Sequence, residues 1–173
     1  MNDYDPITNS HEQQTLKQLA TDATIGIVEI GVFRGESTAM MSKVAKVPIY
    51  AIDPIIPDSI SGVAGDVELI KSNMKDYKDF MFFHDFSYNV VKDFNHKFDV
   101  LFIDGSHNYD DVKKDFEDWF PKLESMGFIL FHDSSPVIGQ VGPQKFVTEL
   151  HSNSDVMFSG CGGSITVFQK VIT

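Results

Sequence analysis

The chain has 173 residues, enough for one domain around one sizeable hydrophobic core. Apolar residues make up 42% and charged residues 23%, a globular composition that excludes a disordered or collagen-like chain. The 14 basic and 25 acidic residues give a net charge of −11, which disfavours a protein that holds nucleic acid through a broad basic surface.

Cysteine content and the length of the apolar runs indicate the compartment. Cys161 is the one cysteine, so no disulfide forms within the chain. The start, Met1 to Asp5, has neither the basic nor the apolar region of a signal peptide, and the apolar runs have the length of strands rather than of a membrane span. We therefore expect a cytoplasmic protein, with no membrane partner, whose residues 1–173 form a single domain.

The predicted elements alternate between short apolar runs, rich in β-branched and aromatic residues, and longer stretches with the period of a helix. A helix over about 10–23 comes first, because Leu16, Leu19, Ala20 and Ala23 share one face. Strands are expected at 25–30, 49–52, 80–83, 98–103 and 128–131. Helices are expected from 36 to 47, over 67–74, on a face that runs through 112–123, and over 144–151. This order is typical of a parallel sheet built from βαβ units.

The tail of the chain predicts two more strands, at 155–158 and 164–170. The connection between them, at 160–163, is so short that the two strands must be antiparallel. The predicted fold class is therefore α/β, a Rossmann-like doubly wound sheet that is mostly parallel and closes with a C-terminal antiparallel strand pair.

Polar residues follow every predicted parallel strand at the point where it ends, while the strand interiors carry almost none. In chain order they are Glu29 with Gly31, Asp53, Asp85, Asp104 with His107, and His132 with Asp133. In an open parallel sheet, ligands bind outside the carboxyl ends of the strands. The sequence therefore predicts a ligand site at this edge of the sheet.

The first strand exit indicates a nucleoside ligand without a pyrophosphate. Gly31 and Gly35 are spaced G-x-x-x-G, and Phe33 stands where the dinucleotide fingerprint G-x-G-x-x-G needs a glycine. The acidic Glu29 suits a ligand with an amino group and a positive charge. Asp53 follows Gly31 by 22 residues, close to the offset at which an acid binds ribose hydroxyls.

These residues carry a family resemblance. The ordered set Glu29-Ile-Gly31-x-x-x-Gly35, Ile52-Asp53-Pro54, Phe102-Ile103-Asp104-Gly105-Ser106-His107-x-Tyr109 and Gly127-x-x-x-x-x-Asp133 resembles the class I S-adenosylmethionine-dependent methyltransferases. Within them it is most similar to the small O-methyltransferase group that includes the macrocin-type and cephalosporin-hydroxylase-like enzymes. The resemblance runs from about 25 to 133. It implies the class I methyltransferase fold, S-adenosylmethionine as cofactor, and O-methylation of a small-molecule or sugar hydroxyl.

The resemblance also implies roles for single residues. Glu29 would hold the methionine amino group directly or through water, Asp53 both ribose hydroxyls and Asp85 the adenine amino group, while Asp104 would face the sulfonium and the acceptor. The implied cofactor-binding set is Glu29, Gly31, Phe33, Gly35, Asp53, Asp85, Phe86 and Asp104.

The chemistry of transfer is expected at the fourth and fifth strand exits. Metal-dependent relatives hold a divalent cation there, and the matching residues are Asp104, His132 and Asp133, a His-Asp pair where those relatives carry two acidic residues. Such a mixed set suits manganese, iron or zinc, with magnesium as a further option. His107 or Asp104 would take the proton from the acceptor hydroxyl.

Simpler interpretations stand beside these. Asp53 alone is compatible with a turn cap before Pro54, Asp85 with a helix N-cap, and His132-Asp133 with an ordinary polar strand exit. The acidic run Asp110, Asp111 and Asp115 is expected on a solvated helix face.

Alternative functions are a metal-dependent hydrolase or another nucleotide-binding α/β enzyme, and a non-catalytic cofactor-binding module. The short N-terminal helix and the loops at 55–65 and 135–142 are the candidate lids over the acceptor. The exposed edge after Ser164 and the 15 Phe favour a homodimer.

Overall fold

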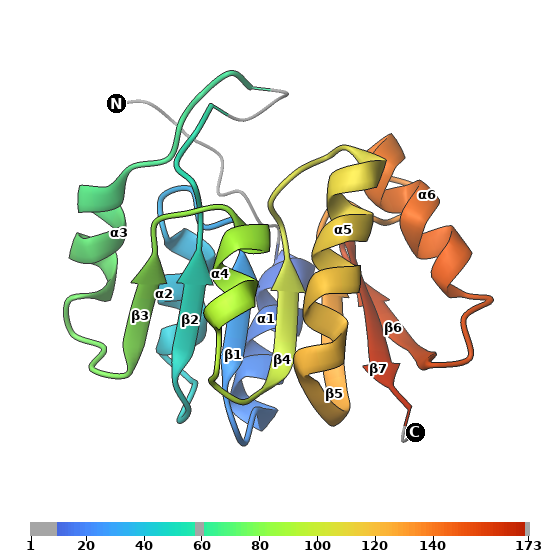
Figure 1. Cartoon of the computed structure of the whole chain (residues 1–173), viewed down its shortest axis with the longest axis horizontal. Coiled ribbons are helices and arrows are strands. Elements are labelled where there is room, and N and C mark those ends of the chain that lie inside the picture. Colours follow the sequence, from blue (N-terminus) through green and yellow to red (C-terminus); the bar gives the residue numbers. More distant parts are fainter. Residues whose placement is uncertain (1–9, 58–60, 172–173) are drawn as a thin grey trace.

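A computed structural model describes residues 10–57 and 61–171 of the chain (Figure 1). The start at 1–5 and part of the predicted lid at 55–65 lie outside the described residues. The helices are α1 (Ser10–Asp22), α2 (Glu36–Ser42), α3 (Val67–Met74), α4 (Ser87–Asp93), α5 (Tyr109–Trp119) with the short 3-10 turn η1 (Phe120–Lys122), and α6 (Val141–Leu150). The strands are β1 (Ile27–Ile30), β2 (Ile49–Ile52), β3 (Phe80–Phe83), β4 (Phe98–Ile103), β5 (Leu123–Phe131), β6 (Val156–Gly162) and β7 (Ile165–Lys170).

The strands form one sheet in the order β3-β2-β1-β4-β5-β7-β6. The first five are mutually parallel, whereas β7 is antiparallel to both β5 and β6. Strand order reverses between β1 and β4, and in such a sheet this switch point is where ligands bind. The predicted fold class is confirmed.

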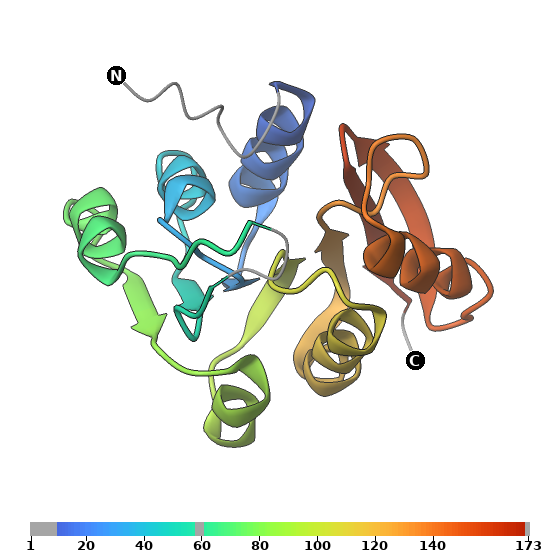
Figure 2. The ribbon, with the colours of Figure 1, turned by 90° about the horizontal axis from the view of Figure 1, so that it is seen from above.

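Helices cover both faces of the sheet, so the molecule has three layers. Viewed onto the edge where the parallel strands end, α1, α2 and α3 lie on one side of the sheet and α4, α5 and α6 on the other (Figure 2). Strands β1 to β5 and β7 contribute side chains to the hydrophobic cores on both faces of the sheet, because successive side chains point to opposite faces. Ile27 packs with Leu16 and Met41 on the first side, while Val28 packs in the cluster that contains Phe116 on the second. Among the described residues, no helix is both long and apolar enough to span a membrane.

Several predicted bounds are confirmed and others differ; α2, for example, ends at Ser42, five residues before the predicted end at 47. Strands β2, β3 and β4 and helix α3 have the predicted bounds. β1 starts two residues late, because the amides of Ile25 and Gly26 donate to the Asp99 carboxylate instead of to a strand. β5 starts five residues early, beyond a register shift opposite Phe98 and Val100. β6 includes Gly160–Gly162, which we assigned to the connection, and α4 was not predicted.

At the switch point, the ends of β1 and β4 touch through backbone alone. The amide of Asp104 donates to the carbonyl of Ile30 at 2.8 Å. Gly31 follows with φ of 89°, and a Cβ built there would lie 2.1 Å from the carbonyl oxygen of Asp104. Because only glycine lacks this atom, Gly31 allows the two strand ends to approach each other.

Replacement of Gly31 by alanine is predicted to destabilise the fold far beyond the strain of its positive φ. Gly62→Ala is the matched control, since Gly62 has φ of 68° with no atom within 4 Å of its built Cβ. We expect a loss of about 1–2 kcal/mol for Gly62→Ala and at least about 2 kcal/mol more for Gly31→Ala in urea unfolding. Equal losses at both positions would show that the close approach is unimportant.

Candidate functional site

The glycine turn that connects β1 to α2 is held by Asp53. The amides of Val32 and Phe33 both donate to Oδ2 of Asp53 at 2.7 Å, and the amide of Ile55 donates to Oδ1 at 2.6 Å. Phe33 has φ of 53° and Ile55 φ of 54°, a strained conformation for both side chains. Asp53 therefore fixes the turn itself, which agrees with its interpretation as a turn cap; its role toward ribose hydroxyls stays a prediction.

The turn is also fixed from the side of α3. The carbonyl of Phe33 accepts from the amide of Asp66 at 2.9 Å, and the carbonyl of Arg34 accepts from Nδ2 of Asn73 at 2.9 Å. Arg34, the one arginine of the chain, places its guanidinium 4.9 Å from the centre of the Phe33 ring. The Phe33 ring thus stays at the position where a dinucleotide site would need a glycine.

Glu29 lies beneath this turn, fully buried in β1. Its two carboxylate oxygens accept from the hydroxyls of Ser37 and Thr38, each at 2.5 Å. Burial raises the pKa of Glu29 to about 8, against the opposing effect of these hydrogen bonds. The hydroxyls of Ser37 and Thr38 were not found from the sequence, although they lie eight and nine residues after Glu29. Contact of Glu29 with an amino group stays a prediction.

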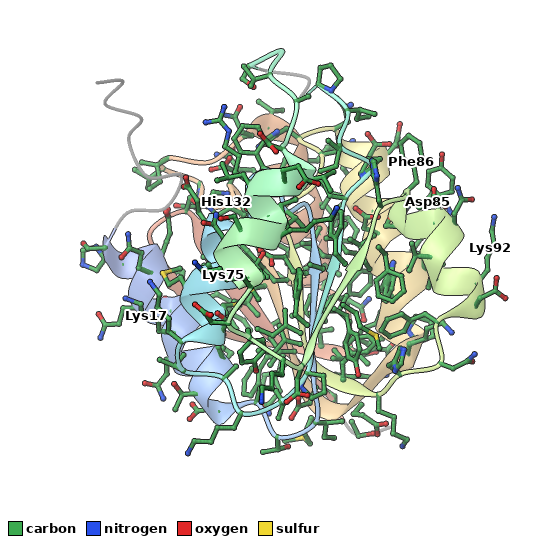
Figure 3. The ribbon with its side chains drawn as sticks, turned by 90° about the vertical axis from the view of Figure 1, so that its left-hand side faces the viewer. Lys17, Lys75, Asp85, Phe86, Lys92 and His132 are labelled. Carbon is green, nitrogen blue, oxygen red and sulfur yellow. The ribbon has the colours of Figure 1, made fainter. Side chains whose placement is uncertain are left out.

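Asp85 and Phe86 mark the exit of β3 and the start of α4 (Figure 3). Oδ1 of Asp85 accepts from the Phe86 amide at 2.7 Å and from Nδ2 of Asn89 at 3.0 Å. These bonds, with that from Asn89 the stronger influence, lower the pKa of the exposed Asp85 carboxyl. Phe86 is exposed and stacks on Tyr88, with ring centroids 5.1 Å apart. Asp85 thus precedes the N-cap residue Phe86 and contacts the side chain of Asn89 in α4 without accepting from a helix amide, beside an exposed aromatic pair.

Asp115 corrects a prediction. It was expected with Asp110 and Asp111 on a solvated face, but its side chain is buried and accepts a short hydrogen bond from the hydroxyl of Ser87. Burial raises the pKa of Asp115 to about 6. No pattern in the sequence indicates this burial, because the partner lies 28 residues away in α4, which is not a predicted helix. The pair fixes the start of α4 to α5.

Where β4 and β5 end, three carboxylates surround the imidazole of His132. Nδ1 of His132 lies 3.0 Å from Oδ1 of Asp104 and 3.6 Å from Oδ2 of Asp133. Nε2 of His132 lies 3.8 Å from Oε2 of Glu12, a buried carboxylate in α1 that also accepts from the amide of Ser164 at 2.7 Å. Figure 3 shows His132 on the side of the sheet that α1 covers. Glu12 was missed from the sequence, because nothing links a helix at the start of the chain to the fifth strand.

Charge keeps the ring of His132 protonated. Burial alone would lower the pKa of His132, but the Asp104 carboxylate, with help from Asp133 and Glu12, outweighs burial and holds it far above its usual value. The ring is therefore an imidazolium ion in the midst of carboxylates, and its Nδ1 donates to Asp104.

His107 pairs with Asp133 beside this cluster. Nε2 of His107 lies 3.0 Å from Oδ2 of Asp133, and both side chains are about one-fifth exposed, at 21% and 24%. Burial would raise the pKa of Asp133, but its contacts with His107 and His132 outweigh burial and hold it far below its usual value. Asp133 has φ of 49°, which turns it toward His107 directly after the strand. The pair is a histidine oriented by a carboxylate, the arrangement of a general base.

The residues predicted for a divalent cation do not present an open set of ligands. The nitrogen of His132 that faces Asp104 donates a hydrogen bond to it, so a metal ion at this nitrogen would have to displace that proton. Among the residues of 10–57 and 61–171, no three His, Cys, Asp or Glu side chains are placed to hold a metal. The cation at Asp104, His132 and Asp133 stays a prediction without structural support.

A family model described as a methyltransferase domain matches residues 28–134, more than half of the chain. The uncharacterized protein R132 of Acanthamoeba polyphaga mimivirus is 29% identical over 116 residues, which is 61% of this chain and 50% of that protein. The uncharacterized protein y4gI of Sinorhizobium fredii is 56% identical over 36 residues, 21% of this chain and 4% of that protein. The chain thus spans half or less of the length of these curated relatives.

Solved structures share the fold. The O-methyltransferase TomG from Streptomyces achromogenes, involved in tomaymycin synthesis and solved in complex with S-adenosylmethionine, is similar with a TM-score of 0.71 at 16% identity. The similarity covers 95% of this chain and 81% of TomG. At this identity the likeness shows the fold alone.

Glu29 is predicted to make stability fall as the pH rises. Between its ordinary pKa of 4.5 and its folded value of about 8, the unfolded chain has lost the proton that the folded chain still holds. Rising pH in this window therefore favours unfolding. Glu29→Gln removes this dependence, so its free energy of unfolding should gain on the wild type by up to about 1.4 kcal/mol per pH unit in the window.

The measurement is urea unfolding of both proteins across that window, with Glu36→Gln, at an exposed position in the first turn of α2, as the matched control. Parallel curves for wild type and Glu29→Gln would contradict a buried proton on Glu29.

Proposed function

Because the chain belongs to the methyltransferase domain family, we propose that it transfers the methyl group of S-adenosylmethionine to a hydroxyl of a small molecule, a sugar hydroxyl included. The His107–Asp133 pair carries this proposal, since its two residues follow β4 and β5 at the same edge of the sheet as the glycine turn that follows β1. O-methylation needs a group that takes the hydroxyl proton, and a histidine held by a carboxylate is such a group.

On the cofactor side, the glycine turn and the exits of β1, β2 and β3 surround the expected place of the nucleoside. Phe33 and the tight turn held by Asp53 disfavour a pyrophosphate, which supports a cofactor without phosphates. TomG was solved with S-adenosylmethionine on the same fold. The residues proposed to contact the cofactor are Glu29, Gly31, Phe33, Gly35, Asp53, Asp85, Phe86 and Asp104.

The transfer itself asks little bond chemistry of the protein, because the cofactor supplies a methyl group already bound to a sulfonium. The protein aligns the acceptor oxygen with the methyl carbon and the sulfur. When bound, the cofactor would supply its methyl group to the acceptor oxygen, with the electron pair of the carbon–sulfur bond left on sulfur. The hydroxyl proton goes to His107, and Asp133 stabilises the imidazolium that forms.

Asp104, Glu12 and His132, which lie beside the His107–Asp133 pair, are proposed to support it without reacting themselves. Asp104, the second candidate for the base, already accepts a hydrogen bond from Nδ1 of His132, and its carboxylate would face the cationic sulfonium. Glu12 holds the opposite side of the His132 ring and ties it to the amide of Ser164.

His107→Ala is predicted to lower kcat by about 10² to 10⁴-fold, because the acceptor proton then lacks its base. Asp133→Asn should lower kcat by a smaller factor, because the ring remains but loses its orienting charge. Transfer of a radiolabelled methyl group from S-adenosylmethionine to a panel of phenols and glycosides measures both effects. His151→Ala, at an exposed histidine that ends α6, is the matched control and should leave kcat unchanged.

Two further readouts separate catalysis from structure. The dissociation constant of S-adenosylhomocysteine should stay within about twofold in His107→Ala, and added imidazole should restore part of its turnover. Undiminished turnover of His107→Ala would remove His107 from the chemistry. Absence of transfer to every acceptor, with the product cofactor still bound, would favour a non-catalytic cofactor-binding module.

A further inference from the structure

Three β-branched apolar side chains stand in solvent on the connection from β5 to α6. Val137 is 86% exposed, Ile138 56% and Val141 81%. Single exposed apolar residues are ordinary on a protein surface, but three within five positions form a patch, and such patches mark binding surfaces. We call Val137, Ile138 and Val141 the apolar lip.

The connection that carries the apolar lip is pinned from within. The amide of Gly139 donates to the carbonyl of Ser135 at 2.8 Å, and the amide of Gln140 donates to the carbonyl of Asp133 at 2.6 Å. Nε2 of Gln144 donates to the same Ser135 carbonyl at 2.7 Å. These bonds hold the backbone in one shape while the apolar side chains point outward, so their exposure is part of the fold.

Both ends of this connection meet the His107–Asp133 pair. The connection begins at Asp133 and leads into α6. Gly142, the second residue of α6, packs against His107, because a Cβ built on Gly142 would lie 2.2 Å from the carbonyl oxygen of His107. The starts of α5 and α6 accordingly lie side by side at the edge where the parallel strands end (Figures 1 and 2). The apolar lip is therefore joined through its backbone to both His107 and Asp133.

Charge near the pair disfavours an anionic acceptor. Glu12, Asp104 and Asp133 place three carboxylates around the two histidines, and the whole chain carries a net charge of −11. A phosphate or carboxylate next to the reacting hydroxyl would be repelled, whereas an uncharged apolar group gains from covering the apolar lip.

On the basis of the proposed function, we infer that the acceptor is an uncharged hydroxyl compound with an apolar or aromatic group beside the hydroxyl, and that Val137, Ile138 and Val141 bind this group. The apolar lip thus selects the substrate, while the His107–Asp133 pair reacts with it.

The test compares acceptors that differ only in their apolar part. Methyl β-D-glucoside and phenyl β-D-glucoside offer the same sugar hydroxyls, and phenol and 2-naphthol offer the same phenolic hydroxyl. We expect kcat/KM to be about tenfold or more higher for the larger member of at least one pair, the scale of selection by an added apolar group. The double variant Val137→Thr/Val141→Thr keeps side-chain shape and should remove most of this preference through KM, with kcat retained.

Ile25→Thr is the matched control, because Ile25 is 39% exposed and precedes β1 at the opposite edge of the sheet. It should leave the preference intact. Binding of S-adenosylhomocysteine should be the same in all variants, since the apolar lip does not belong to the cofactor side.

A measurement independent of turnover completes the test. With valine methyl groups labelled, 2-naphthol added to the complex with S-adenosylhomocysteine should shift the NMR signals of Val137 and Val141. Equal kcat/KM for the two acceptors of each pair, or unshifted signals of Val137 and Val141, would overturn the inference. Methyl transfer to any hydroxyl would still uphold the proposed function in that case. Shifted signals without transfer to any hydroxyl would contradict the proposed function and leave the apolar lip as a binding surface. Signals that shift on dilution alone would assign the apolar lip to a contact between copies and overturn the inference.

Discussion

The backbone contact between the ends of β1 and β4 determines the geometry of the whole ligand edge. Gly31 lies against the carbonyl of Asp104 with no space for a side chain, and the amide of Gly31 also donates to the carbonyl of Ile52 at 2.9 Å. The chain then leaves β1 for α2 on one face of the sheet and leaves β4 for α5 on the other (Figure 2). In an open parallel sheet, ligands bind where two such paths diverge.

Acidic side chains dominate this edge, and each of them forms hydrogen bonds or ion pairs with a different kind of partner. Backbone amides of the glycine turn donate to Asp53, hydroxyls of α2 donate to Glu29, and a protonated imidazole lies between Asp104 and Glu12. Buried acids without such partners would be costly. The acids proposed for the cofactor side are therefore paired with neutral donors, and those proposed for the acceptor side are paired with histidine. A cationic sulfonium suits such an acidic edge, and a proton released from an acceptor has an imidazole to receive it.

Much of this architecture is predictable from the sequence, because strands buried on both faces are continuous apolar runs and their exits are the first polar residues. This logic located β2, β3 and β4 and the residues Asp53, Asp104, His107 and Asp133. It failed where a partner comes from elsewhere in the chain. Glu12 reaches His132 across the whole fold, and Asp115 is buried only because Ser87 of the unpredicted helix α4 meets it. Periodicity encodes which face a residue occupies, whereas contacts between distant segments depend on the packed structure.

The most direct measurement is isothermal titration of the protein with S-adenosylhomocysteine, NAD and ATP, each alone and in competition. The turn fixed by Asp53 and the ring of Phe33 predict saturable binding of S-adenosylhomocysteine at one site per chain and no binding of the two phosphate-bearing nucleotides there. Binding of NAD or ATP that displaces S-adenosylhomocysteine, or binding of either nucleotide in its place, would contradict a methyltransferase site at this edge of the sheet.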